Sequence, residues 1–374
     1  MSGPPPTDLT ANQIAAMSPA AREALEEAQF QLAVAESLRG PWRPQAAAAA
    51  AAAVAVDSPL PRMCNVDAGC WVNTAGHIIW DTEGLPDAIL AEDAPAWMCG
   101  DKVAIAMRGA LQDYRANVET VGATLPLSLE KLHDVVTEKE FAGGQFKRGL
   151  YADAGELVAA LLNHLAGLGA AAAAAVDRSV GLGTGETGYC DSCQLVYRQR
   201  HVGATRMSTL AWATLRDLPP GAGGRLTRAL RVQNSLSGNC EECGESTPVA
   251  VSLHVPPPTV LITIAWEPSS MKDPAAVSAA LDAIDEGLDL AAAFNLSDAS
   301  GATIASAPYR ASAMAMQVED RHYVTFVRHG PSDGWVLLDD AMPVEQLRGW
   351  AEVAAACKRG RMCPTLITFT RRTG

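Results

Sequence analysis

Residues 62–80 read RMCNVDAGCWVNTAGHIIW and predict a loop that delivers a cysteine, Cys70, to the first turn of a helix. At a helix N-terminus a thiolate meets unpaired backbone N–H groups and the positive end of the helix dipole, and both favour the nucleophilic form of the sulfur. Asn65 precedes Cys70 in the same loop, and its side-chain amide could stabilise a tetrahedral oxyanion at that point. The alternative is that Cys70 is a buried core residue beside an aromatic side chain.

A nucleophilic cysteine needs a base from elsewhere in the chain, and the histidine with the most suggestive surroundings is His322. It lies in RHYVTFVRHGPSDGWVLLDD (321–340), where HYVTFV predicts a strand, HGPSDG a turn and WVLLD a returning strand. Such a hairpin brings His322 beside Asp339, whose carboxylate can accept one imidazole N–H and turn the other ring nitrogen toward the thiol. The alternative is a surface hairpin whose two aspartates, Asp339 and Asp340, cap its end.

Two further cysteine pairs occur in YCDSC (189–193) and NCEEC (239–243). The spacing within each pair lets both thiolates reach one ion, and four sulfurs in a tetrahedron are the usual structural zinc site. We therefore predict a structural zinc ion, with free thiols or redox pairs as the alternatives; four thiolates would leave no open position for a catalytic water. The predicted ligands are Cys190, Cys193, Cys240 and Cys243.

The bulk composition is that of an ordinary globular protein, with 48% apolar and 19% charged residues. The net charge of −13 argues against nucleic-acid or anionic-membrane partners and favours a basic one. The first residues, MSGPPPTDLT, lack the pattern of a secretion signal, and no apolar stretch is long enough to span a bilayer. We expect an intracellular protein of the cytoplasm or the nucleus, where close cysteine pairs are more often metal ligands or catalytic groups than disulfides.

Residues 1–60 are predicted to form an N-terminal extension that precedes the main domain. SPAAREALEEAQFQLAVAESL predicts a helix with Ser18 as its N-cap, and Gly40 and Pro41 end it. An alanine-rich linker over residues 46–55 follows, and prolines then mark a boundary near residue 60. The extension is expected to be poorly ordered and without activity, although a docking or targeting role remains open.

The motifs together resemble those of the ubiquitin-specific protease (USP/UBP) family of deubiquitinating cysteine proteases. NVDAGCWVN (65–73) resembles the cysteine box of that family, and HYVTFVR followed by WVLLDD resembles its histidine box. Three further segments are similar to a thumb helix, the central palm strand and the final strand of the family, in the same order: GLYADAGELVAALLNHL, PPPTVLITIAW and CPTLITFTR. The resemblance covers about residues 62–372.

The resemblance implies an α+β, papain-like cysteine protease fold over residues 61–373. A helical thumb over about 62–178 would carry Cys70, and a β-sheet palm over about 256–372 would carry the histidine and the aspartates. Zinc-bearing β fingers over about 180–255 would hold the body of ubiquitin.

The resemblance also implies a mechanism and a substrate. Cys70 would attack the carbonyl of the C-terminal glycine of ubiquitin, Asn65 and a backbone N–H would hold the oxyanion, and His322 would protonate the departing amine. Asp339 would orient His322, with Asp340 in a secondary role. The residues expected to contact the ubiquitin tail are Asp153, Glu156, Trp71 and Tyr323.

Two alternatives to this function stay open, and so does one alternative to the role of the two acids before the thumb helix. The chain could be a degenerate member of the family that binds ubiquitin or a scaffold partner without turnover, or a protease for another ubiquitin-like modifier. Asp153 and Glu156 could be ordinary helix N-terminal acids that complement the helix dipole. The partners expected are ubiquitin and ubiquitinated proteins, and the chain is expected to be a monomer.

Overall fold

The computed structural model describes residues 60, 63, 65, 69–91, 98, 100–119, 127–218, 224–234, 236–240, 242–253, 255–296, 304, 306–319, 322–329 and 333–372. The helix and the alanine-rich linker predicted for the N-terminal extension lie outside these residues. The domain boundary near residue 60 therefore stays a prediction.

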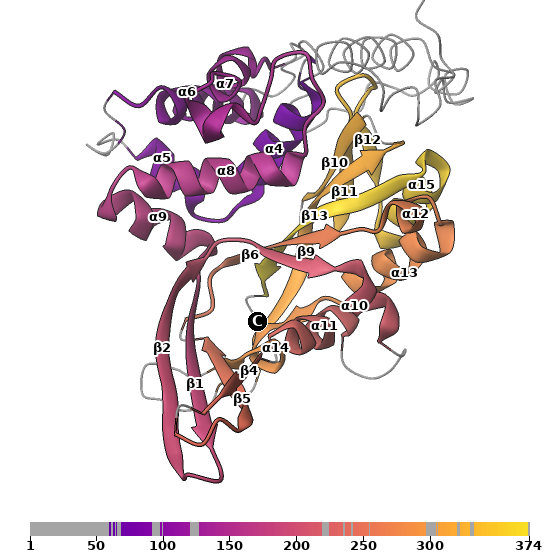
Figure 1. The fold of residues 1–374 in the computed structure, drawn as a ribbon. Helices are drawn as coiled ribbons and strands as arrows, with labels where there is room; N and C mark the ends of the chain where they lie inside the picture. The colour runs from indigo at the N-terminus through magenta and orange to yellow at the C-terminus, as the bar shows by residue number, and fades with distance from the viewer. Residues whose placement is uncertain are drawn as a thin grey trace, which may run out of the picture. The chain divides into compact units, whose positions relative to one another are not determined.

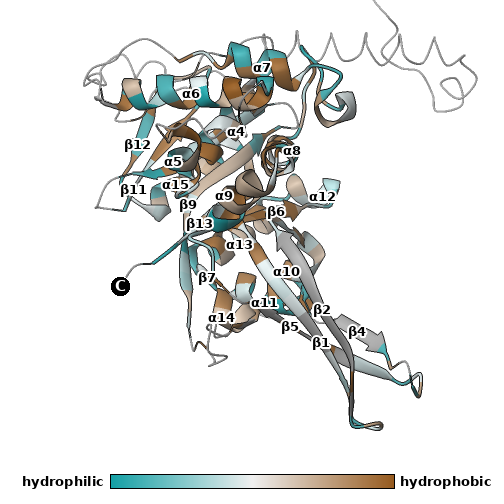
Figure 2. Ribbon diagram, turned by 90° about the vertical axis from the view of Figure 1, so that its left-hand side faces the viewer, coloured by the Kyte–Doolittle hydropathy of each residue, from teal (hydrophilic) through white to brown (hydrophobic). Residues whose placement is uncertain are grey.

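The first part of the described chain is helical (Figure 1). Its helices are α4 (Cys70–Asp81), α5 (Leu85–Leu90), α6 (Lys102–Glu119), α7 (Glu130–Val136), the 3-10 helix η2 (Phe141–Gly144), α8 (Ala154–Gly167) and α9 (Ala170–Val180). Helix α8 forms because apolar residues recur on one face; Leu157, Leu161 and Leu165 are fully buried. Figure 2 shows this concentration of hydrophobic residues on α8.

An eight-stranded sheet follows the order β12-β11-β10-β9-β13-β6-β3, with β7 paired to β9. Its strands are β3 (Ser208–Ala211), β6 (Thr259–Ala265), β7 (Leu288–Asp289), β9 (Pro308–Val318), β10 (His322–His329), β11 (Gly334–Leu338), β12 (Glu345–Leu347) and β13 (Met362–Arg371). The predicted hairpin is confirmed, because β10 and β11 pair in antiparallel fashion from Thr325↔Leu338 to His329↔Gly334.

This sheet separates two hydrophobic cores. Ala313 and Ala315 of β9 belong to the core of the helical region, whereas Met314 and Met316 belong to the core on the opposite face. Small side chains on the first face let α4 lie close against β9. The opposite core is covered by α13 (Pro274–Asp285) and α15 (Trp350–Gly360), with the short helices α12 (Pro268–Met271) and α14 (Leu290–Ala293) nearby.

A second sheet of five strands has the order β2-β1-β5-β4, with β8 paired to β5. Figure 1 shows its long hairpin of β1 and β2 extending away from the larger sheet. The strands are β1 (Leu182–Cys190), β2 (Leu195–Thr205), β4 (Leu236–Asn239), β5 (Ser246–Leu253) and β8 (Asn295–Leu296).

The segment expected to form the fingers, 180–255, is split between the two sheets. Between β2 and β4 the chain returns to the larger sheet, where β3 pairs in parallel with β6 and is followed by α10 (Trp212–Asp217) and α11 (Arg225–Gln233). The physical reason is burial, because the core of the larger sheet includes six residues of this return: Leu210, Trp212, Leu215, Leu226, Ala229 and Leu230. Among the described helices, none combines the length and the apolar character needed to cross a bilayer.

Candidate active site

Cys70 is the first residue of α4, so the predicted helix start at the cysteine is confirmed. The helix begins without a side-chain cap; the Gly69 carbonyl accepts hydrogen bonds from the backbone N–H groups of Val72 and Asn73, at 2.9 and 3.0 Å. The N-terminus of a helix presents backbone N–H groups and the positive end of the helix dipole, and both favour an anion at this position. The Cys70 side chain is only 3% exposed, at the boundary between the helix and the sheet.

His322 opens strand β10, and Asp339 directly follows β11, so the hairpin brings the two side chains together. His322 Nε2 lies 3.0 Å from Asp339 Oδ1. Asp339 is 3% exposed and also accepts the backbone N–H of Ala341 at 2.9 Å, which fixes the carboxylate in place. The side chain of Cys70 also hydrogen-bonds to His322. Because Nε2 of the ring contacts Asp339, we infer that Nδ1 is the nitrogen that faces Cys70.

The environment of His322 favours its protonated form. Burial alone would lower the pKa of His322, but the hydrogen bonds to Asp339 and Cys70, with the charge interactions that accompany them, outweigh burial and raise the pKa to about 11. An imidazolium of this kind is the natural partner of a thiolate. The three side chains can therefore serve as nucleophile, general acid–base and orienting group.

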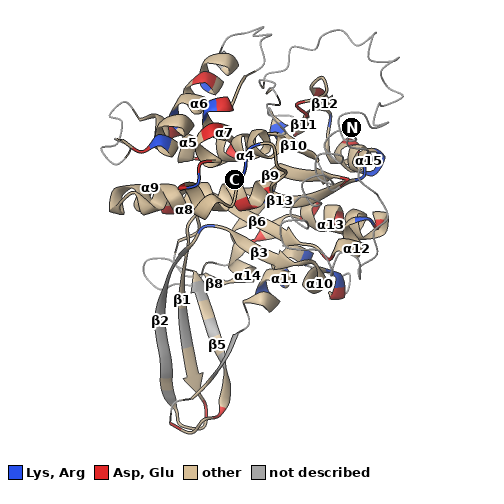
Figure 3. Cartoon of the chain, turned by 45° about the horizontal axis from the view of Figure 1, so that its top comes forward, with Lys and Arg blue, Asp and Glu red and all other residues tan. Residues whose placement is uncertain are grey.

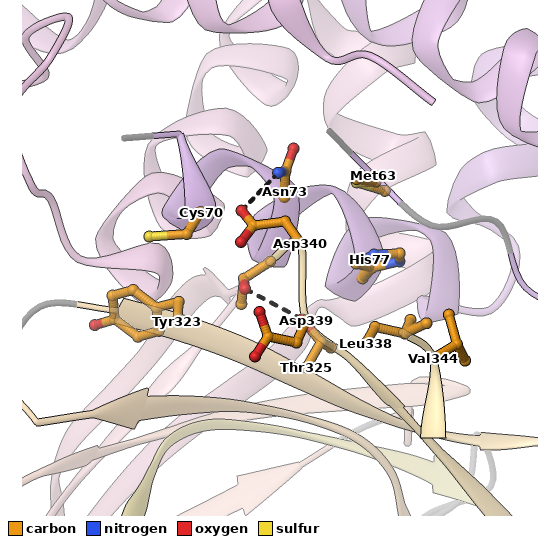
Figure 4. Close-up of a pocket in the computed structure, with 11 residues that line it drawn as sticks. Met63, Cys70, Asn73, His77, Tyr323, Thr325, Leu338, Asp339, Asp340 and Val344 are labelled. Carbon is orange, nitrogen blue, oxygen red and sulfur yellow. Dashed lines mark hydrogen bonds between the residues drawn. The ribbon is translucent and has the colours of Figure 1, made fainter. Parts of the chain in front are cut away.

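Asp340 has different partners from Asp339. Its Oδ2 accepts a hydrogen bond from Asn73 Nδ2 at 3.0 Å (Figure 4). The side chain of Asn65 also hydrogen-bonds to this carboxylate. Its Oδ1 lies 3.8 Å from His322 Nε2. Burial raises the pKa of Asp340, although the charge of His322 and these two amides act in the opposite direction. The carboxylate thus links the loop before α4 to the end of β11.

Asn73 is a site residue to which the sequence analysis gave no role. It lies three positions after Cys70, so both side chains project from the same face of α4. That three-residue spacing from the candidate nucleophile was the available signal. Figure 4 shows Asn73 directed at Asp340. Helix α4 is also bonded to the sheet by Thr325 Oγ1, which donates to Thr74 Oγ1 at 3.2 Å, and by the Ser312 hydroxyl of β9, which donates to Asp81.

Asp153 caps α8 rather than standing free at the surface. Its Oδ1 accepts the backbone N–H of Glu156 at 2.8 Å, and its Oδ2 accepts the hydroxyl of Tyr323 at 2.7 Å. Tyr323 is 2% exposed and stacks on Tyr151 with ring centroids 5.5 Å apart. Burial, together with Tyr151 and Asp153, raises the pKa of Tyr323, so its hydroxyl stays protonated and donates.

The other two residues assigned to substrate lie in different surroundings. Glu156 is exposed, and its carboxylate accepts a hydrogen bond from Gln145 at 2.7 Å. Trp71 is 0% exposed; it stacks on Phe146 with ring centroids 5.5 Å apart and meets His133 edge-on. Trp71 therefore anchors α4 in the core, and the structure leaves it no surface for contact with a substrate.

The four cysteines predicted as ligands converge at the tips of the five-stranded sheet. Their sulfurs all lie within 4.8 Å of one another, with Cys190 3.6 Å from Cys243 and Cys193 3.9 Å from Cys240. A tetrahedral site with zinc–sulfur bonds of about 2.3 Å requires sulfur–sulfur distances of about 3.8 Å. The cluster is therefore compatible with a zinc site.

Backbone N–H groups donate hydrogen bonds to two sulfurs of this cluster. The N–H groups of Cys243 and Glu242 donate to the Cys240 sulfur, which lowers the pKa of Cys240 to about 7. The backbone N–H groups of Cys193 and Ser192 also donate to the Cys190 sulfur, but burial and hydrogen bonds with the thiols of Cys243 and Cys240 outweigh them and raise the pKa of Cys190. Each cysteine pair thus places donors on its first sulfur, an arrangement that stabilises a metal-bound thiolate.

Comparison with known proteins shows what fold the chain has. No family model matches the chain, and no curated protein matches it. Among solved structures it is similar to a chain of the SAGA DUB module, Ubp8/Sgf11/Sus1/Sgf73 bound to monoubiquitin, with a TM-score of 0.56 and 11% sequence identity. The match covers 94% of this chain and 76% of that chain. At this identity the similarity shows a shared fold, a mixed arrangement of helices and sheets.

Proposed function

We propose that this chain is a cysteine-type deubiquitinase that hydrolyses the peptide or isopeptide bond after the C-terminal glycine of ubiquitin. The observation that carries the proposal is the contact of Cys70, at the start of α4, with His322, which is held by Asp339 at 3.0 Å. A fold shared with a module bound to monoubiquitin supports ubiquitin as the substrate, as does the resemblance of the cysteine and histidine motifs.

The reaction follows from these positions. The Cys70 thiolate attacks the carbonyl carbon of the terminal glycine, and the carbonyl oxygen becomes an oxyanion near the first turn of α4. The imidazolium of His322 gives its proton to the departing lysine amine, which leaves a thioester on Cys70. His322, now neutral, removes a proton from water, whose oxygen replaces the sulfur and releases the carboxylate of ubiquitin.

In this proposal Asp340 is a positioning residue. It accepts hydrogen bonds from the amides of Asn65 and Asn73, and Asn65 is the side chain proposed to stabilise the oxyanion. Asp340 thereby holds the donor close to the end of α4 that carries Cys70.

Recognition of the basic ubiquitin tail is assigned to Glu156. Its carboxylate is exposed, whereas both oxygens of Asp153 are occupied by the α8 backbone and by Tyr323. Asp153 and Tyr323 then position the start of α8, and Trp71 holds α4 in the core.

Cys190, Cys193, Cys240 and Cys243 would hold one zinc ion, which supplies structural stability and no catalytic chemistry.

A ubiquitin probe with an electrophile at its C-terminus tests the proposal. Covalent capture by the wild-type chain, lost in Cys70→Ala, is expected. Cys357→Ala is the matched control, because Cys357 is a buried cysteine in the core on the other side of the sheet and should leave capture unchanged. Capture by a probe built on another ubiquitin-like modifier, without capture of ubiquitin, would reassign the substrate.

A second candidate, ubiquitin binding without efficient turnover, is favoured by one feature of the site. Cys70 is 3% exposed, and the amide proposed for the oxyanion is already hydrogen-bonded to Asp340. Saturable binding of ubiquitin to the wild-type chain, without covalent capture, would select this candidate over the enzyme.

A further inference from the structure

A second cavity lies on the face of the large sheet that carries α13 and α15. It has a volume of about 560 Å3, and its floor contains the thiol of Cys363, which is 2% exposed. Its walls come from α12, the start of α13, the end of α15 and the end of β9, with Met271 and Val277 among the apolar residues. Cavities of about 300–1,000 Å3 with mainly apolar walls are typical of ligand sites in proteins.

The rim of this cavity is basic, although the chain as a whole carries a net charge of −13. Lys272, Lys358 and Arg361 line it, against a single acidic lining residue, Glu319. Figure 3 shows basic residues on α15 and between α12 and α13. Arg361 and Glu319 approach to 3.7 Å, but both are largely exposed, and such a pair neutralises little of the local charge.

The helix dipole explains only part of this charge. Lys358 and Arg359 lie in the last turn of α15, where cations complement the negative end of the dipole. Lys272 belongs to a different element, the C-cap of α12, and Arg361 follows α15 in a left-handed conformation with φ of 50°. Only three of these four cations line the cavity, because Arg359 lies apart from it, 3.6 Å from Glu345. Cations from separate elements thus converge on one apolar hollow.

We infer that this cavity is a docking site for an acidic segment of a partner protein. An apolar side chain of that segment fills the hollow above Cys363, and flanking carboxylates pair with Lys272, Lys358 and Arg361. Charge complementarity selects this occupant, because a basic segment such as the tail proposed for the active site would be repelled here. The cavity is separate from the candidate active site, although strand β9, which contributes to the cavity, pairs with strand β10, which carries His322.

The two sites are close in the sheet. Val318 of β9 pairs with His322 of β10, and Gln317, which lines the cavity, pairs with Tyr323. Cys363 of β13 pairs with Gln317 from the other side. A segment bound in the cavity therefore contacts a strand that is directly hydrogen-bonded to the one carrying the proposed base. The docking inference concerns binding alone and does not depend on the proposed enzymatic activity.

Fluorescence anisotropy with a labelled peptide tests the inference on the full chain. The probe has a central Leu-Phe pair with glutamates on both sides, and it should bind in the micromolar range. Two matched peptides, one with lysines in place of the glutamates and one with alanines in place of the Leu-Phe pair, should bind at least about tenfold more weakly.

Charge-reversal variants locate the binding. Lys272→Glu combined with Lys358→Glu should weaken binding of the acidic peptide at least about tenfold. The control combines Arg359→Glu with Lys147→Glu, which makes the same change in net charge at exposed positions outside the cavity and should leave the affinity nearly unchanged. All four side chains are exposed, so both variants should fold.

Equal binding by the cavity and control variants would overturn the inference, because the attraction would then come from net charge alone. The absence of saturable binding by the wild-type chain would overturn it as well. Self-association of the chain, abolished by Lys358→Glu and accompanied by no peptide binding, would assign the cavity to a second copy of the chain instead.

Discussion

Two adjacent aspartates in this site have separate tasks. Asp339 holds the imidazole directly, with Oδ1 3.0 Å from His322 Nε2, whereas Asp340 accepts hydrogen bonds from Asn73 and Asn65. The separation arises because the chain leaves β11 at this point, so consecutive side chains project toward different elements. Substitutions of these two aspartates should therefore have different effects on kcat and KM.

Asp339→Asn and Asp340→Ala should both lower turnover of a fluorogenic ubiquitin amide, for different reasons. Asp339→Asn should reduce kcat by about 10²- to 10⁴-fold, because it removes the carboxylate charge that stabilises protonated His322 and fixes its tautomer. Asp340→Ala should reduce kcat by about 10²-fold with little change in KM, because it releases the amide proposed for the oxyanion. Asn73→Ala, which removes another partner of Asp340, should have a smaller effect. A larger loss in Asn73→Ala than in Asp340→Ala would contradict the positioning role.

The raised pKa of His322 predicts a dependence of stability on pH. The folded-state pKa of about 11 exceeds the ordinary value of 6.5, so folding favours the proton on His322. This contribution is fully present below about pH 6.5 and is lost progressively as pH rises toward about 11. Urea denaturation at several pH values should show wild type losing stability relative to His322→Gln as pH rises. A difference that stays constant over this range would refute the coupling.

At the scale of elements, the start of α8 carries one acid with structural contacts, Asp153, and one exposed acid, Glu156, that we propose contacts the substrate. Asp153 caps the helix and accepts the Tyr323 hydroxyl, so Asp153→Ala should lower the free energy of unfolding by about 1–2 kcal/mol. Glu156→Ala should change it by less than about 0.5 kcal/mol, because Glu156 is exposed, and should instead raise KM for ubiquitin substrates. Chemical denaturation and steady-state kinetics on both variants provide the comparison. The reverse assignment would appear as a KM effect in Asp153→Ala without a loss of stability.

The smaller sheet gives a prediction about metal. If Cys190, Cys193, Cys240 and Cys243 hold zinc, elemental analysis of the purified chain should find about one zinc ion per molecule. Chelation, or Cys240→Ser, should remove the ion and lower the thermal midpoint, because metal binding contributes to the stability of the folded state. Cys357→Ser, at a cysteine outside the cluster, should retain the ion. Full zinc content in Cys240→Ser would exclude this site.

Local patterns in the sequence predicted some elements and missed others. The start of α4 at Cys70 and the pairing of β10 with β11 follow from short-range signals, a loop before an apolar run and a turn between two strands. The return of β3, α10 and α11 to the larger sheet was missed, because it depends on long-range burial of residues such as Trp212. The link from Asn73 to Asp340 spans distant parts of the chain, and no spacing rule reveals it.

At the scale of the molecule, the candidate active site lies where α4 meets the large sheet. Cys70 comes from the helix, and His322 and Asp339 come from the sheet, so their distance depends on how closely the two elements approach. Ala313 and Ala315, both fully buried, are the β9 residues in the core shared with α4. Small side chains at these positions allow α4 to lie close to β9, so the geometry of the candidate site depends on packing outside it.

Enlarging one of these alanines should separate the two halves of the site. Ala315→Leu inserts methylene groups into a filled core, which should lower the free energy of unfolding by about 1–3 kcal/mol and slow capture of the ubiquitin probe by more than the loss of folded protein explains. Met314→Leu is the matched control, because Met314 directly precedes Ala315 on β9 and faces the opposite core, and this substitution nearly conserves the side-chain volume. Its capture rate, measured per folded molecule, should equal that of wild type. If Ala315→Leu also captured the probe at the wild-type rate per folded molecule, the separation of α4 from β9 would not control the contact between Cys70 and His322.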